Sequence, residues 1–218
     1  MKTLAVIALK GGSGKTTVAT HLALAAHLRG LDTLLVDIDP QFSARDILGA
    51  REQPGPSCVT ASGPNVLAAQ FGALADQRDL MIIDTAAGGI EAASEAVVVA
   101  DLVIMVVRPT LIDISGLART LLLVRKLGKP STVIVNQAPV PRESVEAPLV
   151  KRAMKGLDYM QAPVAPVILR SRSIYQTALE RGRSAEEMTD RAAAGEIAAL
   201  WDFIELRMTA SRGDAAQG

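Results

Sequence analysis

Short apolar runs alternate with longer segments of helical periodicity along most of the chain. The runs are rich in Val, Ile and Leu, which is typical of strands buried on both faces. They predict strands at residues 3–9, 33–37, 80–84, 102–107, 131–136 and 166–170. The longer segments predict helices at residues 15–29, 66–77, 90–99, 113–127, 149–157, 173–182 and 189–208. This alternation predicts an α/β fold, with a mostly parallel, twisted sheet and helices on both of its faces.

Two segments rich in proline, glycine or serine, residues 51–64 and 138–148, predict loops. Neither is long enough to separate two domains, and the sequence contains no internal repeat. We therefore predict a single domain over residues 1–210 and a polar, disordered tail at 211–218. Because 49% of the residues are hydrophobic but only 3% are aromatic, the core of this domain must be mostly aliphatic.

The cysteine content and the N-terminal sequence restrict the compartment. Cys58 is the only cysteine in 218 residues, which excludes an intrachain disulfide and a cysteine-based metal site. The apolar run at residues 4–9 leads directly into a glycine-rich loop, unlike a signal peptide. No stretch has 18 uninterrupted apolar residues, as a membrane-spanning helix would require. These features predict a cytoplasmic protein.

A glycine-rich loop lies between the first predicted strand and the first predicted helix. Its glycines let backbone N–H groups turn inward, and the following helix adds its positive end, so the loop can bind phosphates. The residues predicted to hold the nucleotide are Gly11, Gly12, Ser13, Gly14, Lys15, Thr16 and Thr17. Among them, Lys15 would neutralise the outer phosphates and Thr16 would bind Mg²⁺. The strand before the loop and the helix after it favour this interpretation over an ordinary glycine-rich turn.

Carboxylates stand at the ends of two predicted strands. Asp37 and Asp39 lie at the end of one strand, and Asp84 follows four apolar residues in the Walker B pattern. In open α/β sheets, such positions point into the crevice where ligands bind. Asp84 is therefore predicted to hold Mg²⁺ directly or through water. Capping of a strand end is the alternative for a single carboxylate, and also for Asn136 at the end of the strand at 131–136.

The glycine-rich loop departs from the usual pattern because Lys10 occupies its first position. With the segment Asp37-Ile38-Asp39-Pro40-Gln41, the loop resembles the deviant Walker A motif and switch I region of the ParA/MinD family of ATPases. The resemblance implies a P-loop NTPase fold, ATP and Mg²⁺ as cofactors, and an ATP-dependent homodimer. Lys10 would reach across this dimer to the phosphates bound by the other subunit. A solvated lysine at a strand end is the alternative.

The resemblance implies further roles for single residues. Asp39 would orient or activate the attacking water, which makes Asp39 a catalytic candidate together with Lys10 and Lys15. Asp37 would lie near Mg²⁺, and Asn136 would hydrogen-bond adenine. The segment 108–113 resembles a loop near the dimer interface of the family. After Asp84 the chain continues Thr-Ala-Ala-Gly-Gly where the family usually has Thr-Pro-Pro, so we expect a more flexible switch II.

Charge is distributed unevenly, although the net charge of the chain is zero. Residues 119–183 carry 12 basic and 4 acidic side chains, which favours binding to phosphates of nucleic acid. Members of the ParA/MinD family bind DNA without sequence preference through basic residues of the C-terminal half. The resemblance therefore points to DNA contacts at the nucleoid, with these candidates: Arg170, Arg172, Arg181 and Arg183. A solvated charged face is the alternative.

The chain is thus predicted to be a ParA-type ATPase that segregates or positions plasmid, chromosome or protein-cluster cargo. Its slow hydrolysis of ATP would be stimulated by a ParB-like or other cargo adaptor protein. The sequence begins directly at the first strand, as in small ParA proteins without an N-terminal DNA-binding domain. The single cysteine excludes the nitrogenase-reductase branch, which needs cluster-binding cysteines.

A MinD-like membrane-associated positioning ATPase and a nucleotide-dependent biosynthetic enzyme remain the alternatives. MinD proteins dock on membranes through a basic C-terminal helix. Here residues 184–218 carry 3 basic and 7 acidic side chains, the wrong sign for anionic lipid. We therefore expect the last helix to pack on its own domain through these apolar residues: Ile197, Leu200, Trp201, Ile204 and Met208.

Overall fold

A parallel sheet forms the centre of the molecule in the computed structural model, which describes residues 1–8, 10–61, 77–86 and 90–215. Its seven strands lie in the order β3-β2-β4-β1-β5-β6-β7, and every neighbouring pair is parallel. The strands are β1 (Lys2–Ile7), β2 (Thr33–Asp37), β3 (Ser57–Thr60), β4 (Leu80–Asp84), β5 (Leu102–Val107), β6 (Ser131–Ala138) and β7 (Val164–Arg170).

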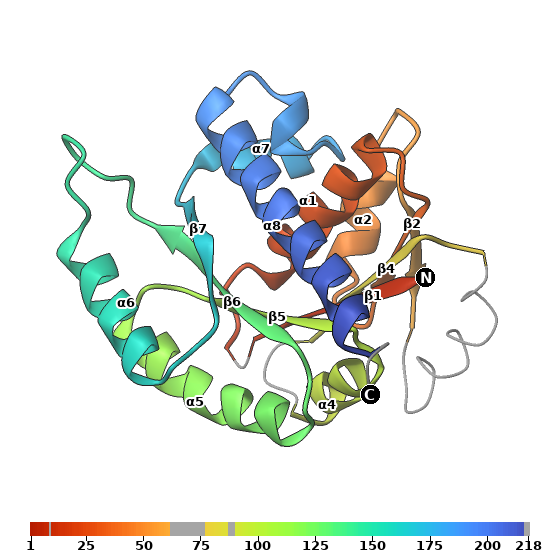
Figure 1. The fold of residues 1–218 in the computed structure, drawn as a ribbon. Helices are drawn as coiled ribbons and strands as arrows, with labels where there is room; N and C mark the ends of the chain where they lie inside the picture. The colour runs from red at the N-terminus through yellow and green to blue at the C-terminus, as the bar shows by residue number, and fades with distance from the viewer. Residues whose placement is uncertain (9, 62–76, 87–89, 216–218) are drawn as a thin grey trace.

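Helices cover both faces of this sheet (Figure 1). One face carries α1 (Lys15–Leu28), α2 (Ser43–Gly49), α7 (Ser173–Leu179) and α8 (Arg191–Ala215), with a short 3₁₀ helix, η1 (Ala185–Glu187), before α8. The other face carries α4 (Ile90–Val99), α5 (Leu111–Lys126) and α6 (Pro148–Tyr159). The predicted fold class, a parallel α/β sheet between two layers of helices, is therefore confirmed.

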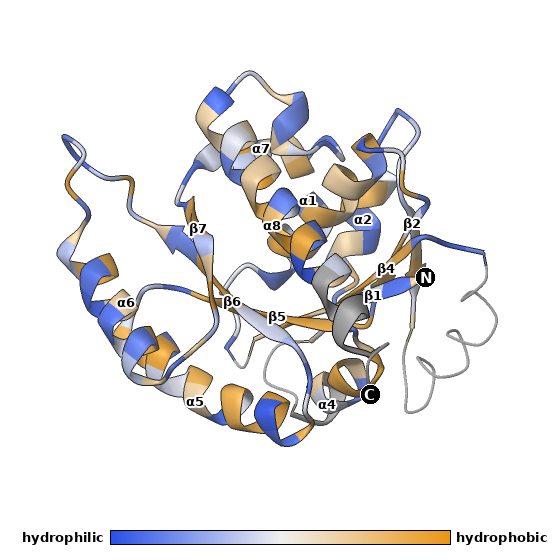
Figure 2. Ribbon diagram, in the orientation of Figure 1, coloured by the Kyte–Doolittle hydropathy of each residue, from blue (hydrophilic) through white to orange (hydrophobic). Residues whose placement is uncertain are grey.

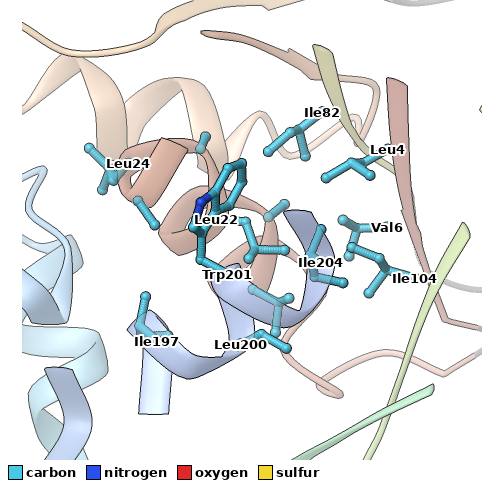
Figure 3. Close-up of a cluster of buried hydrophobic side chains, with 14 of the residues drawn as sticks. Leu4, Val6, Leu22, Leu24, Ile82, Ile104, Ile197, Leu200, Trp201 and Ile204 are labelled. Atoms are coloured by element: carbon cyan, nitrogen blue, oxygen red, sulfur yellow. The ribbon is translucent and has the colours of Figure 1, made fainter. Parts of the chain in front are cut away.

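Two aliphatic cores lie between the sheet and its helix layers. Hydrophobic residues concentrate along β4 and β5, whereas the outer surfaces of the helices are more polar (Figure 2). In the core beneath α8, the Trp201 ring packs among side chains of α1 and the sheet (Figure 3). Trp201, Leu200 and Ile204 are completely buried, as predicted for a C-terminal helix that packs on its own domain. Among the described residues, no helix is long and apolar enough to cross a membrane.

The structure departs from the predicted elements at several places. Residues 57–60, predicted as part of a loop, form the edge strand β3, which pairs with β2 and is only partly buried. Helix α2 was not predicted, because its seven residues are too few to show a helical period. Helix α8 continues to Ala215, so residues 211–215 are helical where a disordered tail was predicted. The helix predicted at 66–77 lies outside the described residues, apart from its last position.

The residues that follow α2 form an ion pair and hydrogen bonds with the C-terminal third of the chain. The Arg51 side chain, 5% exposed, forms an ion pair with Glu187 of η1 at 2.9 Å. Its Nη1 atom also donates to the Gly182 carbonyl at 2.8 Å. Glu187 in turn accepts a hydrogen bond from the Ser184 backbone. These contacts hold the end of α2 against the turn between α7 and η1.

Candidate functional site

The glycine-rich loop lies at the carboxyl end of β1 and leads into α1. Gly12 and Gly14 have φ angles of 75° and 87°, in the left-handed region that glycine adopts without strain. Gly14 is also the N-cap residue of α1, and a Cβ atom there would collide with the Asn136 Nδ2 atom. The loop therefore requires glycine at position 14 for two independent reasons, the left-handed φ and the lack of space for a Cβ atom.

Replacing Gly14 with alanine is expected to lower both stability and nucleotide affinity. The left-handed conformation alone costs an L-residue about 1–2 kcal/mol, and the collision with Asn136 adds to this cost. Thermal unfolding and ATP titration would measure the two effects. Gly49→Ala is the matched control, since Gly49 lies in α2 with no φ in the left-handed region and no atom near an added Cβ. Equal melting temperatures for the two variants would contradict the expectation.

Two side chains near the end of β6 form hydrogen bonds with the backbone of the loop. Asn136 is 4% exposed, and its Nδ2 atom donates to the Ser13 carbonyl at 2.8 Å. Gln137 donates from Nε2 to the Gly12 carbonyl at 3.1 Å and has a φ of 53°. Asn136, predicted from the sequence for a contact with adenine, thus supports the loop itself. Gln137 was missed, and its only signal in the sequence is its place beside Asn136.

Lysines stand at both ends of the loop. Lys15, 6% exposed, begins α1, and burial lowers its pKa although the carboxylates of Asp84 and Asp39 oppose this effect. Lys10 is half-buried and lies beside α5, where a Cβ on Gly116 would be 3.6 Å from its Cε atom. The two cations therefore border the loop on different sides, one facing the carboxylates and the other facing α5.

The predicted carboxylates meet because β2 and β4 are neighbouring parallel strands. Asp37 and Asp84 are directly opposite each other in the register of this pair, and both are completely buried. The Asp37 carboxylate accepts backbone hydrogen bonds from Asp39 at 3.1 Å and, at the start of α2, from Ala44 at 3.0 Å and Arg45 at 3.2 Å. Burial nevertheless raises the pKa of Asp37. Asp39 is half-buried and accepts a hydrogen bond from the Gln41 backbone.

The Asp84 carboxylate has the features of a metal ligand. Burial raises its pKa to about 7, while the neighbouring Thr16 hydroxyl and Lys15 ammonium partly oppose the rise. Neither carboxylate oxygen of Asp84 has a hydrogen-bond partner of good geometry among the described residues. A buried carboxylate without partners is costly unless a cation completes it.

The residues around Asp84 suit Mg²⁺, which takes part of its ligands from phosphates and water, better than a metal ion whose ligands are all protein side chains. Across the described part of the chain, no group of three or more His, Cys, Asp or Glu side chains could hold a metal ion. Mg²⁺ commonly binds through one or two carboxylates together with nucleotide phosphates and water. Thr16, Asp37 and Asp84 are the residues that would hold it at this edge of the sheet.

The predicted DNA contacts do not form one basic cluster. Arg170 pairs with Glu146 at 2.8 Å, and Arg172 pairs with Glu196 at 2.9 Å, so both charges are already neutralised within the fold. Arg181 is exposed, and Arg183 is half-buried beside it, near Glu180 and Glu52. This arrangement leaves Arg181 as the predicted DNA contact that is most available to a ligand.

Helix α6 presents the other exposed basic surface, on the opposite face of the sheet from α7 (Figure 1). Its apolar residues Val150, Ala153 and Leu157 are buried. Lys151, Arg152 and Lys155 are exposed. The spacing of Lys151 and Lys155 places them on one side of the helix. We refer to Lys151, Arg152 and Lys155 as the α6 basic face.

Comparison with known proteins agrees with this geometry. The profile of the CobQ/CobB/MinD/ParA nucleotide binding domain matches residues 4–184, most of the chain and all of the loop and carboxylates described above. The chain belongs to this ParA/MinD family. The family resemblance inferred from Lys10 and the aspartates is thereby confirmed.

Individual relatives of this ParA/MinD protein differ in their extent of similarity. A candidate replication protein A from Rhizobium rhizogenes is 40% identical over 65 residues, which cover 30% of this chain and only 15% of that protein. The maintenance of carboxysome distribution protein A of Halothiobacillus neapolitanus is 23% identical over 200 residues, covering 89% and 92% of the two chains. The McdA–ATP complex of Cyanothece superposes with a TM-score of 0.80 at 20% identity, covering 94% of this chain and 96% of that one. This last similarity concerns the fold.

Proposed function

We propose that this ParA/MinD protein is an ATPase that positions or segregates cargo, and that it dimerises when it binds ATP and Mg²⁺. The observation that carries the proposal is the meeting of the Lys10-led loop, the buried Lys15 and the unpartnered Asp84 carboxylate at one edge of the sheet. Phosphoryl transfer from a nucleoside triphosphate requires a loop that binds the phosphates, a cation that neutralises them and a ligand for the metal ion. The loop, Lys15 and Asp84 would supply these three parts.

Each site residue has a distinct role in this proposal. Backbone N–H groups of the loop and the α1 N-terminus bind the phosphates, and Lys15 neutralises their charge. Thr16, Asp37 and Asp84 hold Mg²⁺, which supplies further charge neutralisation when bound. Asp39 orients the attacking water, and Lys10 acts on the phosphates of the second subunit. Asn136 holds the loop in place and is proposed to contact adenine as well.

The cargo is proposed from the relatives. The relative that matches most of the chain is named for carboxysome distribution, and the relative with the shorter match is named for replication. To position such cargo, the protein is proposed to be held on a cellular surface and to be released when a partner protein stimulates hydrolysis. We propose the nucleoid as this surface, through nonspecific contacts with DNA phosphates.

The α6 basic face and Arg181 are the proposed DNA contacts, because Arg170 and Arg172 are committed to carboxylates. We expect ATP-dependent binding to random-sequence duplex DNA that weakens as salt rises. Lys151→Glu/Lys155→Glu should reduce the affinity at least tenfold, because it reverses two phosphate-binding charges. Electrophoretic mobility or fluorescence anisotropy would measure the binding with ATP, with ADP and without nucleotide, at two salt concentrations.

Control variants identify which basic surface binds DNA. Lys126→Glu/Arg191→Glu changes the net charge by the same amount at two exposed positions on α5 and α8, and should leave the affinity nearly unchanged. Arg181→Glu tests the other candidate surface separately. If wild-type protein binds no DNA in any nucleotide state, the nucleoid proposal is wrong. ATP-dependent binding to anionic vesicles would then favour the membrane-associated alternative.

A further inference from the structure

A third cation, Arg108, borders the phosphate loop, and two of its three nitrogens are fixed. Arg108 follows β5 directly. Its Nε atom donates to Asp113 Oδ2 at 2.6 Å, and its Nη2 atom donates to Asp113 Oδ1 at 3.2 Å. This two-pronged contact holds the planar guanidinium in one orientation.

Asp113 is itself held firmly in the first turn of α5. Its side chain is 4% exposed, and its backbone N–H donates to the Thr110 hydroxyl, the N-cap of the helix, at 3.2 Å. The anchor for Arg108 is therefore a buried carboxylate on a capped helix.

The remaining nitrogen of Arg108 faces the loop. Nη1 donates no hydrogen bond to any residue in the described part of the chain, and it lies 3.8 Å from the position that a Cβ on Gly12 would occupy. The Arg108 side chain is 35% exposed, so a ligand can reach it. The carboxylate partner is buried while the guanidinium reaches solvent, so the ion pair fixes the orientation of Arg108 and leaves Nη1 accessible.

The position along the loop indicates which phosphate this nitrogen can reach. The inner phosphates are bound at the N-terminus of α1, which begins at Lys15. Gly12 comes earlier in the loop, between β1 and the start of α1, so we expect the outer end of the phosphate chain beside it. Gly12 carries no side chain and is exposed, so the space between the guanidinium and the loop backbone is open.

We propose that Arg108 binds the terminal phosphate of the nucleotide held by its own loop, and that Asp113 positions Arg108 for this contact. The inference rests on the proposed function, since it takes a nucleoside triphosphate as the ligand of the loop. It assigns a role to the segment after β5 that the Walker motifs do not include. Arg108 thereby distinguishes ATP from ADP, because only ATP has the phosphate that Arg108 contacts.

The test compares the affinities of the full-length protein for Mg-AMPPNP, a triphosphate that is not hydrolysed, and for Mg-ADP. Arg108→Ala is expected to weaken AMPPNP binding about 10- to 100-fold, the usual range for one charged hydrogen bond, and ADP binding by less than about threefold. Arg108→Lys should fall between wild type and Arg108→Ala, because lysine keeps the charge but cannot form the two-pronged contact.

Asp113→Asn tests the positioning role, since it removes the charge that orients Arg108. It should lower the ratio of AMPPNP to ADP affinity in the wild-type background and have no further effect in the Arg108→Ala background. Arg125→Ala is the matched control. Arg125 is an arginine near the end of α5, and its Nη2 atom donates to the carbonyls of Met160 and Gln161. Thermal unfolding of every variant identifies losses of affinity that come from misfolding.

The outcomes separate this inference from the proposed function. If wild-type protein binds neither nucleotide, both are overturned. If wild type binds both nucleotides and Lys15→Ala loses both, the nucleotide site stands. An unchanged ratio of AMPPNP to ADP affinity in folded Arg108→Ala and Arg108→Lys then overturns the role of Arg108 alone. A selective loss of AMPPNP affinity in those variants, absent from Arg125→Ala, supports it.

Discussion

Replacing Lys15 with alanine is expected to abolish ATP binding at ordinary nucleotide concentrations. Lys15 is the buried cation at the start of α1, where it is proposed to neutralise the charge of the phosphates. An exposed side chain elsewhere does not reach this buried position. Loss of one charged contact with phosphate alone corresponds to about a 100-fold loss of affinity. The change also removes a cation that opposes the rise in the pKa of Asp84, so this carboxylate becomes a poorer ligand for Mg²⁺.

Isothermal titration with ATP and with ADP would measure the effect of Lys15→Ala. Lys126→Ala is the control, because Lys126 is exposed near the end of α5. The Lys126→Ala protein should bind both nucleotides as wild type does. ATP affinity within a factor of about three of wild type in the Lys15→Ala protein would rule out the phosphate-loop assignment.

Asp39→Ala is expected to leave ATP binding largely intact but to slow hydrolysis about 100-fold or more. Asp39 lies after β2, is half-buried, and uses one carboxylate oxygen to accept the Gln41 N–H. Its other oxygen remains able to orient a water molecule. Its negative charge also raises the pKa of Lys15, the lysine proposed to bind the phosphates.

Single-turnover hydrolysis of bound ATP would isolate the chemical step in the Asp39→Ala protein. Asp46→Ala offers a comparison, because Asp46 is an exposed carboxylate of α2 that pairs with Arg45. It should hydrolyse ATP at the wild-type rate. Unchanged turnover in the Asp39→Ala protein would mean that a different group positions the water.

The central strands could be predicted from the sequence because they are buried on both faces and read as continuous apolar runs. The observed bounds of β2, β4 and β5 agree with those runs. Strand β3 could not be predicted in the same way. It is a short edge strand of the sequence Ser-Cys-Val-Thr, and it forms because β2 offers a partner along the sheet edge.

The site was predictable as far as it depends on local spacing. The loop and Asp84 follow known spacings, and the parallel sheet brings them together without further information. Contacts between distant segments were not predictable. Nothing near Arg170 or Arg172 in the sequence indicates that Glu146 and Glu196 neutralise them, since each partner is 24 residues away. The support of the loop by Gln137 likewise depends on the strand order, in which only β5 separates β6 from β1.

Helix α2 has one end at Asp37, a ligand of the proposed metal site, and the other end beside the C-terminal third of the chain. Asp37 accepts N–H groups from its first turn, and Arg51, just beyond its end, is locked to Gly182 and Glu187. The Oδ2 atom of Asp37 accepts both of those N–H groups, so a metal ion bound by Asp37 in the proposed site would share this carboxylate with α2. Metal affinity and the placement of α2 would then be thermodynamically linked. By reciprocity, a change that breaks the Arg51–Glu187 ion pair would also change the affinity of the proposed metal site, which lies at the other end of this seven-residue helix.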